Sequence, residues 1–287
     1  MSGKKTRRNA LKAALSVGLV GFSGVSSGAK PDDDRRESPD QIGTGSKKLD
    51  LGEVEGMSER EYRNYVEKVR SEDGLEAAKR VNPFYEDGPS TSSTPGGANT
   101  VYVDAWNTNL DIVLDDGTHL GDVQCDATLF RSVDAPEGQY HYWFWLNSNS
   151  KPNSGPWWWT AKPNSMENGI NVIDNDFAVT HYKPKSTVPV REKKYRIGSK
   201  IEFGDVGYGT TDTVYKSYGR NQPITTIQGN EGEYRVRWDL GDSSPRYENI
   251  ALNATVRLRS DRKLEKDSEI PSGLFTWYPT GTMKRTF

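Results

Sequence analysis

Apolar and polar residues alternate over much of the chain from residue 99 onward, and this pattern predicts β-strands. In the clearest case, residues 234–240, four apolar positions alternate with charged ones, as in a strand with one buried face. Asp115, Asp116 and Gly117 form a sequence typical of a tight turn. Further strands are expected at 100–105, 110–114, 123–133, 139–147, 170–182, 200–203, 213–218, 223–227, 252–258 and 274–278. These strands, without a convincing helix among them, predict an all-β antiparallel β-sandwich or jelly roll over residues 99–287.

Residues 57–83 have a different period and predict a short helical segment. Ser58 with Glu61 three residues later forms a capping-box pattern, which marks a helix start. One apolar face follows at helical spacing, formed by Tyr62, Tyr65, Val66 and Val69. The segment is either a detachable arm or pro-segment, or a helix docked on the following domain, and the sequence leaves both open.

Linkers are expected on both sides of this helical segment. Residues 29–56 are rich in charged, Gly and Ser residues and have too little apolar surface to fold, so they predict a disordered linker. Residues 84–98 contain a run of Gly, Pro, Ser and Thr, which indicates a flexible linker.

The first 28 residues have the three parts of an export signal. A basic start with Arg7, Arg8, Leu11 and Lys12 precedes an apolar run that ends in small residues. The segment resembles the twin-arginine signal peptides of bacteria and archaea, and the combination with the acidic linker is similar to exported proteins of halophilic archaea. The resemblance implies the twin-arginine translocase as a partner and an extracellular or cell-envelope location.

Charge and cysteine content agree with an exported chain that folds before transport. The whole chain has a formal net charge of −2, and loss of five basic residues with the signal would make it −7. This balance disfavours a nucleic-acid partner. Cys125 is the single cysteine, which excludes an intramolecular disulfide. Its apolar neighbours predict a small buried residue rather than a nucleophile.

Tryptophans are concentrated in one part of the chain, since six of the eight lie between residues 106 and 159. Residues 140–146 alternate so that His141, Trp143 and Trp145 face one side and other large residues the opposite side. Both sides are therefore apolar, which requires a central strand or a loop that covers the second face. Trp157, Trp158 and Trp159 follow in a segment that its Pro, Asn and Ser content predicts to be a loop.

These aromatic residues have three open interpretations, two of which are ligand sites. Flat indole rings stack on sugar rings while polar neighbours bind hydroxyl groups. Indole rings also suit a membrane interface. Alternatively, the loop folds back as a lid over the edge of the sandwich. The expected ligand-binding residues are His141, Trp143, Trp145, Trp157, Trp158 and Trp159.

A basic band is expected if residues 234–240 pair with residues 252–259. Arg235, Arg237, Arg257 and Arg259 would then point outward together, and guanidinium groups suit carboxylate, sulfate or phosphate. The alternative is ordinary ion pairing with nearby acidic residues on a solvated sheet.

Catalytic and metal signatures are weak. The three histidines, His119, His141 and His181, have no metal-binding spacing, and no phosphate loop or nucleophile elbow is present. No catalytic residue, metal site or cofactor is therefore expected. Calcium at Asp174 to Asp176 is one interpretation of that segment, and a solvated strand edge is the other.

The sequence thus predicts an exported, non-catalytic binding protein that recognises a glycan or cell-surface polymer. One alternative is a secreted antimicrobial protein that acts on the membranes of competing cells, with membrane lipid as its partner. The other alternative is a secreted jelly-roll glycan hydrolase.

Overall fold

A computed structural model gives the fold. It describes residues 41–85, 100–133, 135–183, 188–189, 194–196, 200–203, 206–209, 214–216, 220–228, 231–240, 250–266 and 269–287. The expected signal peptide with Arg7, Arg8, Leu11 and Lys12, the start of the first linker and nearly all of the second linker lie outside the described residues.

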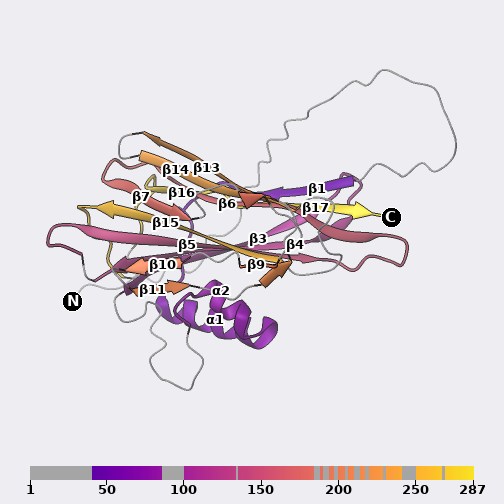
Figure 1. Cartoon of the computed structure of the whole chain (residues 1–287), viewed down its shortest axis with the longest axis horizontal. Helices are drawn as coiled ribbons and strands as arrows, with labels where there is room; N and C mark the ends of the chain where they lie inside the picture. Colours follow the sequence, from indigo (N-terminus) through magenta and orange to yellow (C-terminus); the bar gives the residue numbers. More distant parts are fainter. Residues whose placement is uncertain are drawn as a thin grey trace, which may run out of the picture. The chain divides into compact units, whose positions relative to one another are not determined.

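Two antiparallel sheets form a sandwich, so the predicted all-β fold is confirmed (Figure 1). Sheet A has the path β1-β17-β6-β14-β13-β8, and β16 joins it by pairing with β6 and β2. Its strands are β1 Gln41–Ser46, β2 Leu49–Asp50, β6 Thr160–Val172, β8 Val188–Pro189, β13 Arg220–Gln228, β14 Glu231–Asp239, β16 Phe275–Trp277 and β17 Thr280–Thr286.

Sheet B has the order β3-β4-β5-β15-β7. Its strands are β3 Thr100–Val113, β4 His119–Ser132, β5 Tyr140–Pro152, β7 Phe177–Lys183 and β15 Ile250–Ser260. Two further strand pairs complete the described β-structure: β9 Lys194–Arg196 with β12 Val214–Lys216, and β10 Lys200–Phe203 with β11 Val206–Gly209.

The strand β5 lies at the centre of sheet B and has large side chains on both faces. Its inner residue Phe144 packs edge-on against Phe275 of sheet A, with ring centroids 5.1 Å apart. Its outer residues Trp143 and Trp145 are also buried, at 2% and 0% exposure. From the sequence, either a central strand or a covering loop was expected; the strand is central, and its second face is covered by helices rather than by a loop.

Helices α1 Glu59–Asp73 and α2 Leu75–Val81 cover the outer face of sheet B. Ser58 and Glu61 form the predicted capping box. Tyr62 stacks on Tyr102 of β3 at 5.1 Å, and the Trp145 indole N–H donates to the Arg80 carbonyl oxygen at 2.6 Å. The helical segment is therefore docked on the sandwich, which was one of the two possibilities that the sequence left open. No helix among the described residues has the length and apolar character needed to span a bilayer.

The prediction of a disordered linker was wrong for residues 41–50. Strand β1 pairs with β17 from Gln41 opposite Arg285 to Ser46 opposite Thr280. An edge strand is held by backbone hydrogen bonds and needs few apolar side chains, which is why the composition was misleading. Gly45 has a specific role here, since a Cβ at this position would lie 2.9 Å from the Ile112 side chain of β3.

A buried carboxylate fixes α1 against sheet B. Asp126 is 1% exposed and accepts hydrogen bonds from the Tyr65 hydroxyl at 2.5 Å and from the Asn147 amide at 2.8 Å. Burial raises the pKa of Asp126 to about 6, although both hydrogen bonds favour its ionised form. Ionisation of the buried Asp126 therefore destabilises the fold, and Tyr65 of α1 provides one of the two hydrogen bonds that partly offset this destabilisation.

Stability should depend on pH through Asp126. The pKa of Asp126 is higher in the folded than in the unfolded chain, so its protonated carboxyl group favours folding. This contribution is complete below about pH 4 and is lost as the pH rises through about 6. The difference between the two pKa values corresponds to about 3 kcal/mol in the free energy of unfolding. Asp126→Asn should flatten this part of the curve in urea unfolding across that range. The exposed Asp115→Asn variant is the control, and an equal slope in both variants would contradict the assignment.

Candidate functional site

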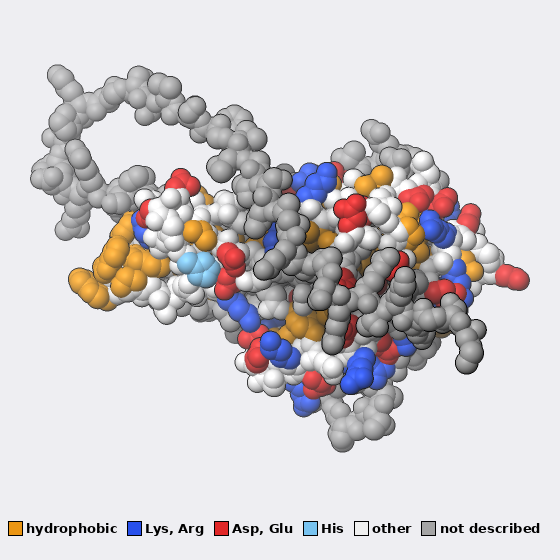
Figure 2. All heavy atoms as spheres, turned by 180° about the vertical axis from the view of Figure 1, so that it is seen from behind, with side chains coloured by type: hydrophobic (Ala, Val, Ile, Leu, Met, Phe, Trp, Pro, Cys, Tyr) orange, Lys and Arg blue, Asp and Glu red, His pale blue; other side chains and the backbone are white. Residues whose placement is uncertain are grey.

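Three exposed aromatic residues form an apolar projection that we call the aromatic tip: Trp157, Trp158 and Phe287. Their exposed fractions are 98%, 49% and 57%, and they are the exposed aromatic residues among the large hydrophobics of the described chain. Figure 2 shows hydrophobic side chains gathered in a projecting patch on the left of that view. The tip combines the connection between β5 and β6 with the residue that follows β17, and β17 pairs with β6.

A buried ring anchors the tip to the sandwich. Trp159 is 7% exposed, and its ring lies so close to Gly155 that a Cβ there would be 2.5 Å from a ring atom. Trp158 contacts Trp159 edge-on, with centroids 6.4 Å apart, and stacks on Phe287 at 6.0 Å with an interplanar angle of 15°. The Trp158 and Phe287 rings are thus held by packing, whereas Trp157 is 98% exposed.

Arg285 supports the other side of the tip. Its guanidinium lies 5.4 Å from the centre of the Phe287 ring. The same group bonds to Asp116 at 3.1 Å and to the Thr118 hydroxyl at 3.2 Å, in the connection between β3 and β4. The Arg285 side chain is 10% exposed, so its charge is largely enclosed and is paired with a carboxylate.

The structure does not assemble the predicted aromatic platform. Trp143 and Trp145 were predicted to bind ligand and are buried under the helices, while Trp159 is the anchor of the tip. His141 lies at the opposite end of β5 from the tip and is half-buried. The prediction was wrong for these tryptophans because the second face of β5 is covered by α1 and α2, which sequence alternation alone does not reveal. Of the six residues, Trp157 and Trp158 are exposed together.

The predicted arginine band is also wrong, because the two strands do not pair. β14 pairs with β13 and β6 in sheet A, whereas β15 pairs with β5 and β7 in sheet B. Arg235 forms ion pairs with Glu167 at 3.1 Å and with Glu233, and Arg237 pairs with Asp239 at 2.7 Å. These two arginines follow the alternative of ordinary ion pairing.

Arg257 and Arg259 lie elsewhere, on the outer face of sheet B. Their register partners on β5 are Trp143 and His141. Arg257 lies over the Trp143 ring at 5.1 Å and donates to the Nδ1 atom of His141 at 2.9 Å. The structure therefore brings three of the predicted residues, His141, Arg257 and Arg259, onto neighbouring positions.

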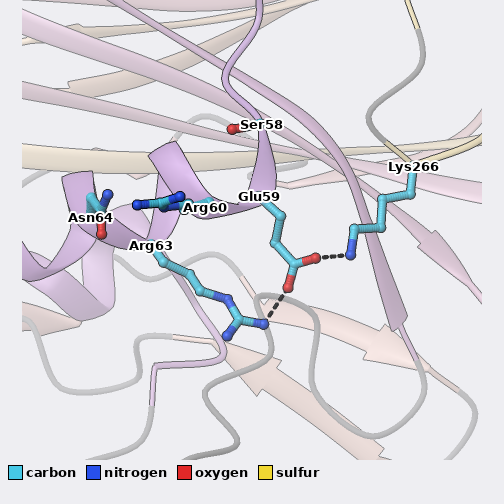
Figure 3. Close-up of a pocket in the computed structure, with 6 residues that line it drawn as sticks. All are labelled: Ser58, Glu59, Arg60, Arg63, Asn64 and Lys266. Carbon is cyan, nitrogen blue, oxygen red and sulfur yellow. Dashed lines mark hydrogen bonds and ion pairs between the residues drawn. The ribbon is translucent and has the colours of Figure 1, made fainter.

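A pocket of about 410 Å³ lies at the start of α1, and Figure 3 shows the side chains that line it. Its lining residues are Ser58, Glu59, Arg60, Arg63, Asn64 and Lys266. Burial alone would raise the pKa of Glu59, but the hydrogen bonds and charges of Lys266 and Arg63 lower it overall. Because the carboxylate already bonds to both cations, the pocket holds α1 to the segment after β15 rather than presenting an open charge.

One group of possible metal ligands was missed by the sequence reasoning. Asp111, His119 and Asp122 offer ligand atoms that all lie within 4.8 Å of one another. His119 Nε2 is 3.1 Å from Asp122 Oδ1, and Asn153 is hydrogen-bonded to its Nδ1. The feature that could have indicated this group is the pairing of β3 with β4, which places Asp111 opposite Asp122.

The segment from Asp174 to Asp176 is poorly suited to bind calcium. Asp174 Oδ1 accepts from the Asp176 backbone N–H at 2.8 Å, and its other oxygen lies 3.7 Å from Arg262. The Asp174 carboxylate is thus committed to a turn and an ion pair.

Cys125 is buried, and burial raises the pKa of its thiol to about 12, which makes it inert as a nucleophile at neutral pH.

Comparisons with known proteins give weak similarities of fold. No protein-family model and no curated protein matches the chain. A solved structure described as a pore forming protein has a TM-score of 0.30 and 9% identity, over 57% of this chain and 75% of that chain. The Clostridium perfringens delta-toxin has the same TM-score and identity, over 57% and 78%. The membrane-inserted form of the Clostridium perfringens NetB toxin has a TM-score of 0.25 and 9% identity, over 54% and 78%.

Trp157 and Trp159 should differ sharply in their effect on stability. Trp159→Ala removes a buried anchor and should lower the free energy of unfolding by about 3 kcal/mol. Trp157→Ala removes an exposed ring and should change it by less than about 0.5 kcal/mol. Urea unfolding of both variants measures the difference. A large effect of Trp157→Ala, or none of Trp159→Ala, would contradict the arrangement.

Proposed function

We propose that this protein is exported by the twin-arginine route and acts on membranes, binding the lipid surface through the aromatic tip. The observation that carries the proposal is the exposure of Trp157, at 98%, beside the half-exposed rings of Trp158 and Phe287. Membrane action by a secreted protein was an alternative of the sequence analysis, and the placement of the tryptophans favours it over the others.

Exposed rings of this size favour a partner that removes them from water. A buried aromatic side chain removes about 150–250 Å² from solvent. At about 25 cal/mol per Å², transfer of the exposed parts of three rings would contribute on the order of 10 kcal/mol before the costs of association. The headgroup boundary of a bilayer suits indole rings, because it is apolar on one side and hydrated on the other.

The geometry of the tip favours a lipid surface over a sugar. Sugar and other small-ligand sites are concave and combine apolar walls with a few converging polar groups. Trp157 projects with nearly its whole surface in water, and Trp158 uses one side for its stacking contact with Phe287. A projecting group can insert between lipid headgroups without a conformational change.

Anchoring of the tip lowers the entropy cost of binding. Trp159 packs under the loop, and Arg285 holds the neighbouring strand to the β3–β4 connection. The Trp158 and Phe287 rings are already positioned by stacking, so they lose little conformational freedom when they insert, and more of their transfer free energy remains as affinity.

The Trp157→Ala/Trp158→Ala double variant should bind vesicles at least about tenfold more weakly than the parent chain, because the apolar area that leaves water is reduced. Co-sedimentation with phosphatidylcholine and phosphatidylglycerol vesicles measures binding. Leakage of an enclosed dye distinguishes binding alone from permeabilisation.

Ile173→Ser is the matched control for this experiment. Ile173 is 42% exposed but follows the other end of β6, so its replacement removes exposed apolar area away from the tip. Equal loss of binding in the control and in the double variant would point to general hydrophobic adhesion. Saturable binding to a polysaccharide that is lost in the double variant, with no binding to vesicles, would replace the lipid proposal with glycan recognition.

A further inference from the structure

The side chains of His141, Arg257 and Arg259 form a second candidate site, which we call the arginine–histidine cluster. Arg257 and Arg259 alternate along β15, and Arg259 lies opposite His141 on β5. Both arginines therefore point from the same face of sheet B. Arg259 is exposed, while Arg257 and His141 are half-buried, so the cluster reaches the surface and is enclosed at its base.

The charge of the cluster is not compensated by a carboxylate. Among the described residues, neither Arg257 nor Arg259 lies within ion-pair distance of an aspartate or glutamate, including Asp261 near the end of β15, whereas both arginines of β14 form such pairs. The Arg257 Nε–H is buried and has no partner in the described part of the chain. The Nε–H groups of Arg235 and Arg285 likewise lack a hydrogen-bond partner among the described residues, but both of these arginines have a carboxylate in ion-pair contact. A buried donor without a partner is costly, so the combination of an unpartnered Nε–H and an uncompensated charge at Arg257 indicates a place for an acceptor.

Each of the three side chains has a hydrogen-bond donor to offer. Arginine can only donate, so the 2.9 Å bond from Arg257 to His141 makes Nδ1 the acceptor. The neutral ring then carries its proton on Nε2, which is a further donor. Burial and the charges of Arg257 and Arg259 all lower the pKa of His141, which agrees with an excess of positive charge around the ring.

We propose that the arginine–histidine cluster binds an oxyanion, a phosphate or sulfate group. The planar guanidinium groups match the spacing of its oxygens. Arg257 is held by the Trp143 ring at 5.1 Å, so at least one fork is fixed before binding. Each arginine should contribute a factor of about ten to the affinity.

This site is separate from the aromatic tip. His141 is at the start of β5, and the loop with Trp157 follows the end of β5 at Pro152. At about 3.4 Å per residue, the strand separates the two by roughly 37 Å. The cluster could therefore bind a soluble anion while the tip contacts a membrane, and its oxyanion affinity does not depend on the lipid proposal.

Imidazole nuclear magnetic resonance of the full chain tests the proposal, since three histidines give few signals. Sodium sulfate and sodium phosphate should produce a saturable shift of the His141 resonances and raise its pKa, relative to sodium chloride at equal ionic strength. The affinity for either anion, taken from the saturation of this shift, should fall about tenfold in Arg259→Gln, and both the shift and the pKa change should be lost in Arg257→Gln/Arg259→Gln. Arg237→Gln, which removes an exposed arginine paired with Asp239, should leave them unchanged.

The outcomes separate clearly. A His141 response that chloride reproduces, or that survives in the double variant, overturns the proposal. Because Arg259 is exposed, Arg259→Gln should fold even if the double variant does not. Phosphatidylglycerol vesicles added to the Trp157→Ala/Trp158→Ala variant distinguish the source of the anion: a His141 shift identifies a lipid phosphate, and its absence beside a sulfate response identifies a soluble one.

Discussion

The two-faced apolar character of β5 is the constraint on which the rest of the structure depends. A strand with Phe144 on one face and Trp145 on the other can be central to a sheet only if both faces are dry. Sheet A covers the first face, and α1 with α2 covers the second. The helical segment is therefore part of the fold rather than an appendage, because its loss would expose a continuous aromatic surface formed by Tyr102, Phe130, Trp143 and Trp145.

Covering a sheet with helices creates a second requirement, which is to satisfy the polar groups trapped between them. Asp126 lies on the covered face and accepts hydrogen bonds from the Tyr65 hydroxyl of α1 and from the Asn147 amide of β5. Asn253 donates to the Arg80 carbonyl oxygen of α2. These directional contacts fix how the helices lie on the sheet, a choice that the non-directional packing of aromatic rings leaves free.

The sequence predicts the class of fold well because strand alternation and burial have the same period. It gives the inward face of β14 and of β15 correctly, since Tyr234, Val236, Leu252 and Val256 are all buried. It does not give the neighbours of these strands, because an apolar inner face fits either sheet. The expected pairing of the two strands, and with it the arginine band, was wrong for this reason. Strand β1 was missed because backbone pairing leaves little trace in composition.

The two candidate sites were predictable from the sequence to different degrees, and they differ in kind: one exposes apolar rings, and the other has a positive charge without a carboxylate partner among the described residues. At the tip, the exposed loop was expected, but the choice of Trp159 as the buried ring depends on its contact with Gly155, a three-dimensional detail. There the charge of Arg285 is enclosed and paired with Asp116, and the property that a partner would cover is exposed apolar area. At the arginine–histidine cluster the apolar ring of Trp143 is buried and the charge has no carboxylate partner among the described residues. A lipid surface would remove the exposed rings of the first site from water, and an oxyanion would neutralise the charge of the second. The two ends of β5 therefore favour chemically different partners.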